Sequence, residues 1–193
     1  MILKKIIAIA CSTGGPKALQ QVVPYLDERI GCPVVIVQHM PDGFTKALAD
    51  RLNANSKLPV CESENNQILK NNNIYIAKAG FHLKIEKIRN EHRIIHTDED
   101  TRLGVKPCAD YMYESLATSG YDEIICVVLT GMGSDGSDGI EYLKQSKKIK
   151  LIVQDKDSCV VFGMPGSVLK RNKDCITCKL SDIGNEIIKN AEG

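Results

Sequence analysis

A serine, a histidine and an aspartate each follow a short apolar run of the sequence. Ser12 lies in "IACSTGG", His39 in "VQHMPDG" and Asp135 in "TGMGSDG". A serine hydroxyl, an imidazole and a carboxylate are the nucleophile, the base and the orienting group of a hydrolytic triad. "ACSTG" also resembles the nucleophile-elbow pattern G-x-S-x-G, with Ala10 at the first position. The order Ser, His, Asp differs from the order of the α/β-hydrolases, which disfavours that superfamily.

Each of the three residues also has a structural interpretation. A serine at a strand-to-helix turn commonly caps the helix, and an aspartate at a helix start complements the helix dipole. A lone histidine is commonly a hydrogen-bonded structural residue. The joint placement of Ser12, His39 and Asp135 after three separate apolar runs favours the triad. Cys11 directly precedes Ser12, and the elbow-like turn predicts that Ser12 is the nucleophile while Cys11 points back into the sheet.

The apolar runs have the length and composition of strands that are buried on both faces. They are "IIAIA" (6–10), "VVIV" (34–37), "IICVVL" (124–129) and "LIV" (151–153). Helical patterns are present at 16–26, 43–53, 108–120 and 138–146. Strands that alternate with helices indicate a parallel sheet covered by helices on both faces.

The segment 73–96 differs from this alternation. Its runs "NIYIA", "HLKIEKI" and "HRIIH" are short and partly alternating, which indicates antiparallel strands. The predicted fold class is therefore α/β: a doubly wound, mostly parallel sheet with helices on both faces and a small antiparallel hairpin excursion. We expect a single domain over residues 1–193.

In an open parallel sheet, ligands bind outside the carboxyl ends of the strands. Ser12, His39 and Asp135 each follow a different predicted strand, so we expect all three at one edge of the sheet.

The loop "GMGSDG" (131–136) has an alternative interpretation as a nucleotide-binding loop. It matches G-x-G-x-x-G between a strand and a helix, and Asp155 follows at a distance suited to a ribose-binding acid. Asp135 would place a negative charge where the pyrophosphate must sit, and Ser12 and His39 would have no role. A nucleotide-binding α/β module is therefore the alternative to a serine esterase.

Composition excludes several other classes. The chain has 193 residues, 43% of them hydrophobic, and a net charge of +1, which argues against a nucleic-acid binder that relies on charge. No apolar segment approaches the roughly 20 residues of a membrane span, so we expect no membrane insertion. Eight cysteines without a signal peptide indicate a cytoplasmic protein. "CITC" (175–178) lacks a second ligand pair, which favours structural cysteines.

Five blocks of the sequence resemble the catalytic domain of the CheB-type protein-glutamate methylesterases of bacterial chemotaxis. The blocks are "STGGP", "QHMPDGFTKALADRLN", "YIAKAGFHL", "LTGMGSDGSDGI" and "SCVVFGMP". They occur in the order of the family between about residues 5 and 170. One block alone is a weak signal, whereas the five together are specific.

The resemblance implies an activity and a set of site residues. It places the nucleophile at Ser12, the base at His39 and the acid at Asp135. It also places Thr13 and Met132 in oxyanion or substrate binding, Met132 through its backbone N–H. The implied substrate is the glutamate γ-methyl ester of a methylated chemoreceptor cytoplasmic domain, with deamidation of receptor glutamines as a related reaction. No metal or cofactor is expected. Many members have a receiver domain that acts as a regulator in a longer natural chain, and we expect residues 1–193 to contain the methylesterase catalytic domain without that receiver domain.

Overall fold

A seven-stranded parallel sheet forms the centre of the molecule. The computed structural model describes residues 3–192. The strand order is β10-β9-β8-β1-β2-β5-β3, and every neighbouring pair is parallel. The strands are β1 (Lys5–Cys11), β2 (Val34–Gln38), β3 (Val60–Glu62), β5 (Ile74–Ile76), β8 (Glu123–Val128), β9 (Lys148–Gln154) and β10 (Ile176–Cys178).

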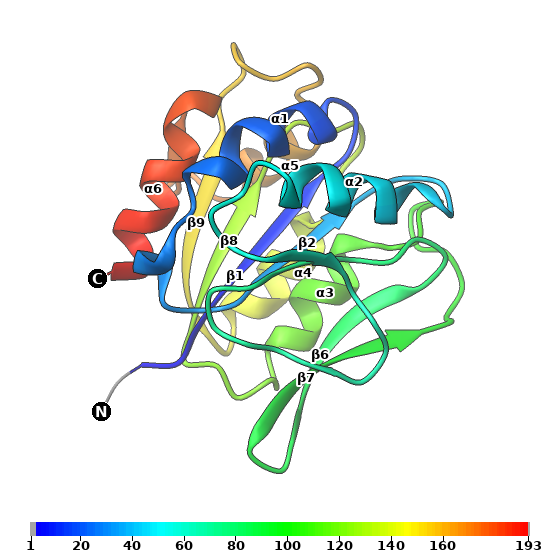
Figure 1. Ribbon diagram of the computed structural model, residues 1–193. Coiled ribbons are helices and arrows are strands. Elements are labelled where there is room, and N and C mark those ends of the chain that lie inside the picture. The colour runs from blue at the N-terminus through cyan, green and yellow to red at the C-terminus, as the bar shows by residue number, and fades with distance from the viewer. Residues whose placement is uncertain (1–2, 193) are drawn as a thin grey trace.

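Helices cover both faces of this sheet (Figure 1). One layer contains α1 (Gly15–Val22), α2 (Phe44–Asn53) and α6 (Leu180–Glu192). The other layer contains α3 (Ala109–Leu116), α4 (Ser137–Lys144) and α5 (Met164–Arg171). Two short 3-10 helices, η1 (Val23–Tyr25) and η2 (Glu28–Ile30), follow α1.

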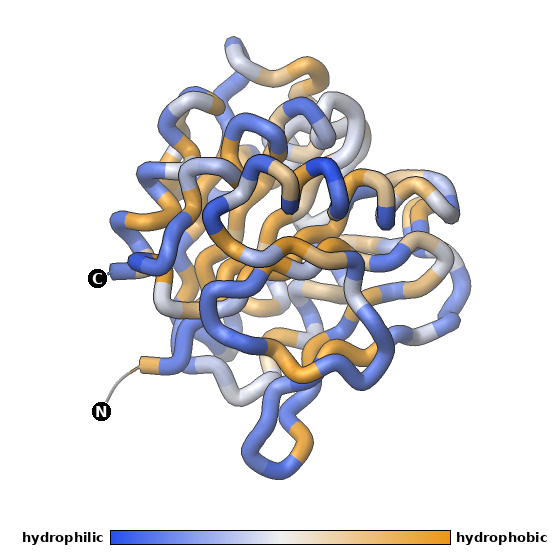
Figure 2. Tube along the Cα trace, in the orientation of Figure 1, coloured by the Kyte–Doolittle hydropathy of each residue, from blue (hydrophilic) through white to orange (hydrophobic). Residues whose placement is uncertain are grey.

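Side chains of the central strands alternate between these two layers. In β1, Ile7 and Ile9 pack against the α1 layer, whereas Ala8 and Ala10 pack against the α3 layer. All of these side chains are fully buried, so the strand needs apolar residues at every position. Figure 2 shows the same result as hydrophobic colour along the central strands. The predicted α/β class, with helices on both faces, is confirmed.

A second, three-stranded sheet packs against α3. It has the order β4-β7-β6 and is antiparallel. Its strands are β4 (Gln67–Ile68), β6 (His82–Ile88) and β7 (Glu91–Thr97). The predicted hairpin excursion is therefore present. The prediction for "NIYIA" was wrong, because Ile74–Ile76 is a parallel strand of the central sheet between β2 and β3.

Candidate active site

The carboxyl ends of β1 and β2 place Ser12 beside His39. Cys11 pairs with Gln38 in the parallel register, and each is the last residue of its strand. Ser12 and His39 directly follow these two residues, so they lie at the same edge of the sheet. In the sheet, β2 lies on one side of β1 and β8 lies on its other side, so the connections that follow β1 and β8 run in opposite directions. This is the point in an open parallel sheet where a crevice forms and ligands bind.

A buried glutamine connects the backbones of these two residues. The Gln38 side-chain amide donates to the carbonyl of Ser12 at 3.0 Å and to the carbonyl of His39 at 2.9 Å. Gln38 is 1% exposed. A Cβ at Gly15 would lie 1.9 Å from Gln38 Oε1, so a side chain at this position would displace the Gln38 amide. Neither Gln38 nor Gly15 was predicted from the sequence to have a role in the site.

We expect Gln38→Met to lower kcat for ester hydrolysis by roughly tenfold or more, with little change in KM. The variant keeps the side-chain length but loses both bonds, and displacements of about 1 Å at a reacting group are worth up to a hundredfold in rate. Steady-state kinetics measure the effect. Gln154→Met is the control for loss of a buried glutamine, because Gln154 is equally buried, accepts from the Thr130 N–H after β8 and donates to the Ser158 carbonyl after β9. Equal losses of kcat in the two variants would contradict a specific role for Gln38.

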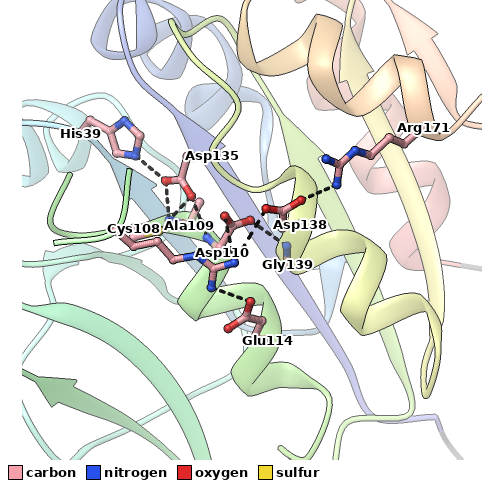
Figure 3. A network of polar contacts seen from close by, with 10 residues as sticks. His39, Cys108, Ala109, Asp110, Glu114, Asp135, Asp138, Gly139 and Arg171 are labelled. Atoms are coloured by element: carbon pink, nitrogen blue, oxygen red, sulfur yellow. Dashed lines mark hydrogen bonds and ion pairs between the residues drawn. The ribbon is translucent and has the colours of Figure 1, made fainter. Parts of the chain in front are cut away.

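Asp135 lies opposite His39 in a hydrogen-bonded pair (Figure 3). His39 Nε2 is 2.7 Å from Asp135 Oδ2, and Asp135 is 2% exposed. Burial raises the pKa of Asp135, but hydrogen bonds from His39, the Ala109 N–H and the Cys108 thiol outweigh it, so the pKa falls below its usual value. Asp135 is therefore an anion at neutral pH, and the Nε2 of His39 must donate the proton. The Nδ1 of His39 is left as the acceptor.

The Ser12 hydroxyl is half-buried and makes no hydrogen bond within residues 3–192, so a Ser12–His39 hydrogen bond is not formed. Ser12 is also not a helix cap, since α1 begins at Gly15 with Gly14 as its N-cap. Catalytic hydrogen bonds are often long before substrate binds, so this geometry is compatible with a nucleophile. Cys11 is fully buried, as expected, and burial raises the pKa of its thiol.

Two backbone donors beside Ser12 lack a protein acceptor. The N–H groups of Thr13 and Met132 donate to no backbone carbonyl in the described part of the chain. The loop of Met132 lies directly on Ser12, because a Cβ at Gly131 would be 2.9 Å from Ser12 Cβ. Free N–H groups at this position are suited to an oxyanion.

Large apolar side chains are exposed around the same edge of the sheet. Phe44 begins α2 after β2, Met132 follows β8 and Val160 follows β9. Met132 is 73% exposed and Val160 is 66% exposed. Exposed apolar side chains that gather near a site are typical of surfaces that bind other proteins.

The structure gives the glycines of "GMGSDG" a role without a nucleotide. Gly133 and Gly136 have positive φ angles, and Gly131 allows the close approach to Ser12. The Gly139 N–H, in the first turn of α4, donates to the buried Asp110 carboxylate at 2.7 Å. A protein carboxylate therefore already occupies the helix N-terminus that a pyrophosphate would need. This arrangement disfavours the nucleotide-binding alternative.

Asp110 is a buried carboxyl group that the sequence analysis did not identify. It is fully buried, and burial raises its pKa to about 6, assisted by the charge of Asp135 and opposed by the Gly139 N–H and Arg102. An acidic residue in the first turn of a helix is common, so its sequence position gives no signal.

We expect the free energy of unfolding of the wild type to fall, relative to that of Asp110→Asn, as pH rises from about 4 to about 6. Over this range the folded protein keeps a proton that the unfolded chain has lost, so stability decreases with pH. The expected change is roughly 2 kcal/mol. Urea unfolding at several pH values measures it. If the difference in the free energy of unfolding between the two proteins did not change with pH, this would contradict a raised pKa for the buried Asp110 carboxyl group.

The cysteines other than Cys11 are also free thiols, including Cys175 and Cys178 of "CITC". These two are half-buried at the edge strand β10 and its approach. Burial raises the pKa of Cys178 to about 11, which makes a reactive thiolate unfavourable. Within residues 3–192, each helix is too short or too polar for a membrane span.

Comparison with models of protein families shows which family the chain belongs to. The family model described as CheB methylesterase matches residues 7–187. This chain belongs to the CheB methylesterase family. The resemblance identified in the sequence is thereby confirmed, and the matched range includes Ser12, His39 and Asp135.

Individual members of the CheB methylesterase family agree with this assignment. The protein-glutamate methylesterase/protein-glutamine glutaminase 1 of Saccharophagus degradans is 44% identical over 168 residues, which are 87% of this chain and 45% of that protein. The Bacillus subtilis protein-glutamate methylesterase/protein-glutamine glutaminase is 40% identical over 167 residues, 86% of this chain and 47% of that protein. The chain thus spans about half the length of the curated relatives it matches.

A solved structure of the family has the same fold. The crystal structure of the Thermotoga maritima CheB methylesterase catalytic domain matches with a TM-score of 0.92 and 36% identity. The match covers 98% of this chain and 100% of that one. The similarity therefore extends over the whole of that catalytic domain.

Proposed function

We propose that this chain is a serine esterase that hydrolyses glutamate γ-methyl esters on a protein, with Ser12 as nucleophile, His39 as base and Asp135 as the group that orients His39. The main support is the hydrogen-bonded His39–Asp135 pair at the edge of the sheet where Ser12 follows β1. Membership of the CheB methylesterase family supports the ester substrate.

The reaction follows from the residue types. Nδ1 of neutral His39 takes the proton from the Ser12 hydroxyl as its oxygen attacks the ester carbonyl. Asp135 accepts from Nε2 and stabilises the imidazolium. The N–H groups of Thr13 and Met132 bind the oxyanion, and one such donor is worth roughly 3–4 kcal/mol in a serine protease.

The second half of the reaction uses the same groups. Protonated His39 donates to the departing oxygen, and methanol leaves. A water molecule, deprotonated by His39, then attacks the acyl group on Ser12 and releases the γ-carboxylate. With a glutamine side chain the leaving group is ammonia, and the acyl-enzyme is identical. Deamidation therefore needs no further residue.

The proposed substrate is a methylated chemoreceptor cytoplasmic domain. The exposed side chains of Phe44, Met132 and Val160 favour a protein over a small ester. Methanol release from a methylated receptor fragment tests the proposal, with a small γ-glutamyl methyl ester as the comparison. We expect a much higher kcat/KM for the receptor fragment. If neither the receptor fragment nor the small ester released methanol, the proposed function would be contradicted.

A further inference from the structure

Helices α3 and α4 each receive their N-terminal cap from the other. Asp135, which precedes α4, accepts from the N–H groups of Ala109 at 2.6 Å and Asp110 at 2.9 Å, in the first turn of α3. Asp110 in turn accepts from the Gly139 N–H at 2.7 Å, in the first turn of α4 (Figure 3). Neither helix is capped by the side chain of its own N-cap residue. The two carboxylates therefore exchange the usual capping role.

This exchange leaves little freedom between the two helices. A Cβ at Gly139 would lie 2.7 Å from both Cα and the carbonyl oxygen of Asp110, so the backbones are in contact. Asp110 Oδ2 has no hydrogen bond within residues 3–192 and lies 3.5 Å from the Arg102 guanidinium. A buried carboxylate with so few partners lowers the stability of the fold, which favours a functional role for its hydrogen bond from the Gly139 N–H.

We propose that Asp110 is a positioning residue for Asp135. Its bond to Gly139 fixes the start of α4 against the start of α3, and this contact holds the Asp135 carboxylate on His39 Nε2. The inference rests on the proposed function, because it assigns Asp135 to catalysis.

Asp110 also adds charge behind the His39–Asp135 pair. One of its oxygens lies within 4.8 Å of an Asp135 oxygen. The charged groups that face Asp110 are Asp135, Asp138 of α4 and Arg102. Arg102 is shared, since it also pairs with Glu114 at 2.6 Å and lies 4.0 Å from Asp138. Removal of the Asp110 charge therefore reduces the negative potential that stabilises the His39 imidazolium.

Two substitutions separate the hydrogen bond from the charge. Asp110→Ala removes the acceptor for the Gly139 N–H, and we expect kcat to fall at least tenfold with KM little changed. Asp110→Asn keeps an acceptor oxygen, so we expect kcat at pH 8 within about threefold of the wild type. The same variant should move the acid limb of the kcat/KM profile to lower pH by roughly half a unit.

Asp138→Asn is the matched control. Asp138 belongs to the same helix start, but its side chain is 53% exposed and pairs with Arg171. Removal of this charge should leave both kcat and the acid limb unchanged, because solvent screens an exposed group. An equal shift in Asp138→Asn and Asp110→Asn would overturn the assignment to Asp110.

A spectroscopic measurement tests the inference without catalysis. The proton on His39 Nε2, bonded to Asp135 at 2.7 Å, should give a downfield imidazole N–H resonance. We expect this resonance in the wild type and Asp110→Asn, and its loss or upfield movement in Asp110→Ala. An unchanged resonance and rate in Asp110→Ala would overturn the inference. If Asp110→Ala does not fold, an unshifted acid limb in Asp110→Asn overturns it.

These readouts also distinguish the inference from the proposed function. A wild type that releases no methanol contradicts the esterase assignment, whereas the His39 resonance still decides whether Asp110 positions Asp135.

Discussion

Replacing Ser12 with alanine is expected to abolish ester hydrolysis without a loss of folding. The hydroxyl makes no hydrogen bond within residues 3–192 and caps no helix, so its removal leaves no buried partner unpaired. Removal of the nucleophile from a serine protease lowers kcat on the order of 10⁶-fold, and we expect a loss of at least about 10³-fold here. Methanol release from a methylated receptor fragment measures the rate.

Cys11→Ala is the control for this result. Cys11 is fully buried one residue before Ser12, and burial raises the pKa of its thiol, which disfavours a nucleophilic thiolate at this position. We expect the variant to keep most of its activity. Activity that survives Ser12→Ala and disappears in Cys11→Ala would reverse the assignment.

Asp135→Asn is expected to lower kcat at least a hundredfold. The two oxygens of Asp135 accept from His39, the Cys108 thiol and two backbone N–H groups of α3. An asparagine has one oxygen, so its NH2 group must face a donor. The equivalent change in a serine protease costs on the order of 10⁴ in kcat because the histidine adopts the wrong tautomer. The unpaired groups should also lower the free energy of unfolding by roughly 2 kcal/mol.

Circular dichroism confirms folding of this variant, and NAD titration tests the nucleotide alternative in the same sample. If "GMGSDG" bound a pyrophosphate, removal of the Asp135 charge would leave NAD affinity unchanged or improve it. We expect lost hydrolysis and no NAD binding. Unchanged hydrolysis in a folded variant would refute a triad that contains Asp135.

The sequence predicted the parts of the fold that depend on local composition. β1, β2 and β8 are buried on both faces, so each is a continuous apolar run that pattern analysis detects. β5 was assigned to the wrong sheet because its three residues follow a polar run and show alternation. Its parallel pairing with β2 and β3 is a long-range contact that no local pattern encodes.

The same limit applies to the candidate site. Ser12, His39 and Asp135 were predicted as site residues because each follows a predicted strand, and the topology of a parallel sheet places such residues at one edge. Gln38 and Asp110 form hydrogen bonds with backbone groups that are distant in the sequence. Such contacts between neighbouring strands or helices produce no periodic pattern in the sequence. These two residues are therefore findings of the structure.

The most direct test of a Ser12-based esterase is covalent labelling with a serine-directed fluorophosphonate, followed by peptide mass mapping. We expect one adduct, on Ser12, and a loss of ester hydrolysis that matches the labelled fraction. The reaction should be slowed strongly in His39→Ala, because His39 removes the proton from the Ser12 hydroxyl. An adduct on another residue, undiminished hydrolysis after Ser12 is labelled, or no adduct on enzyme that is hydrolysing ester would contradict Ser12 as the nucleophile.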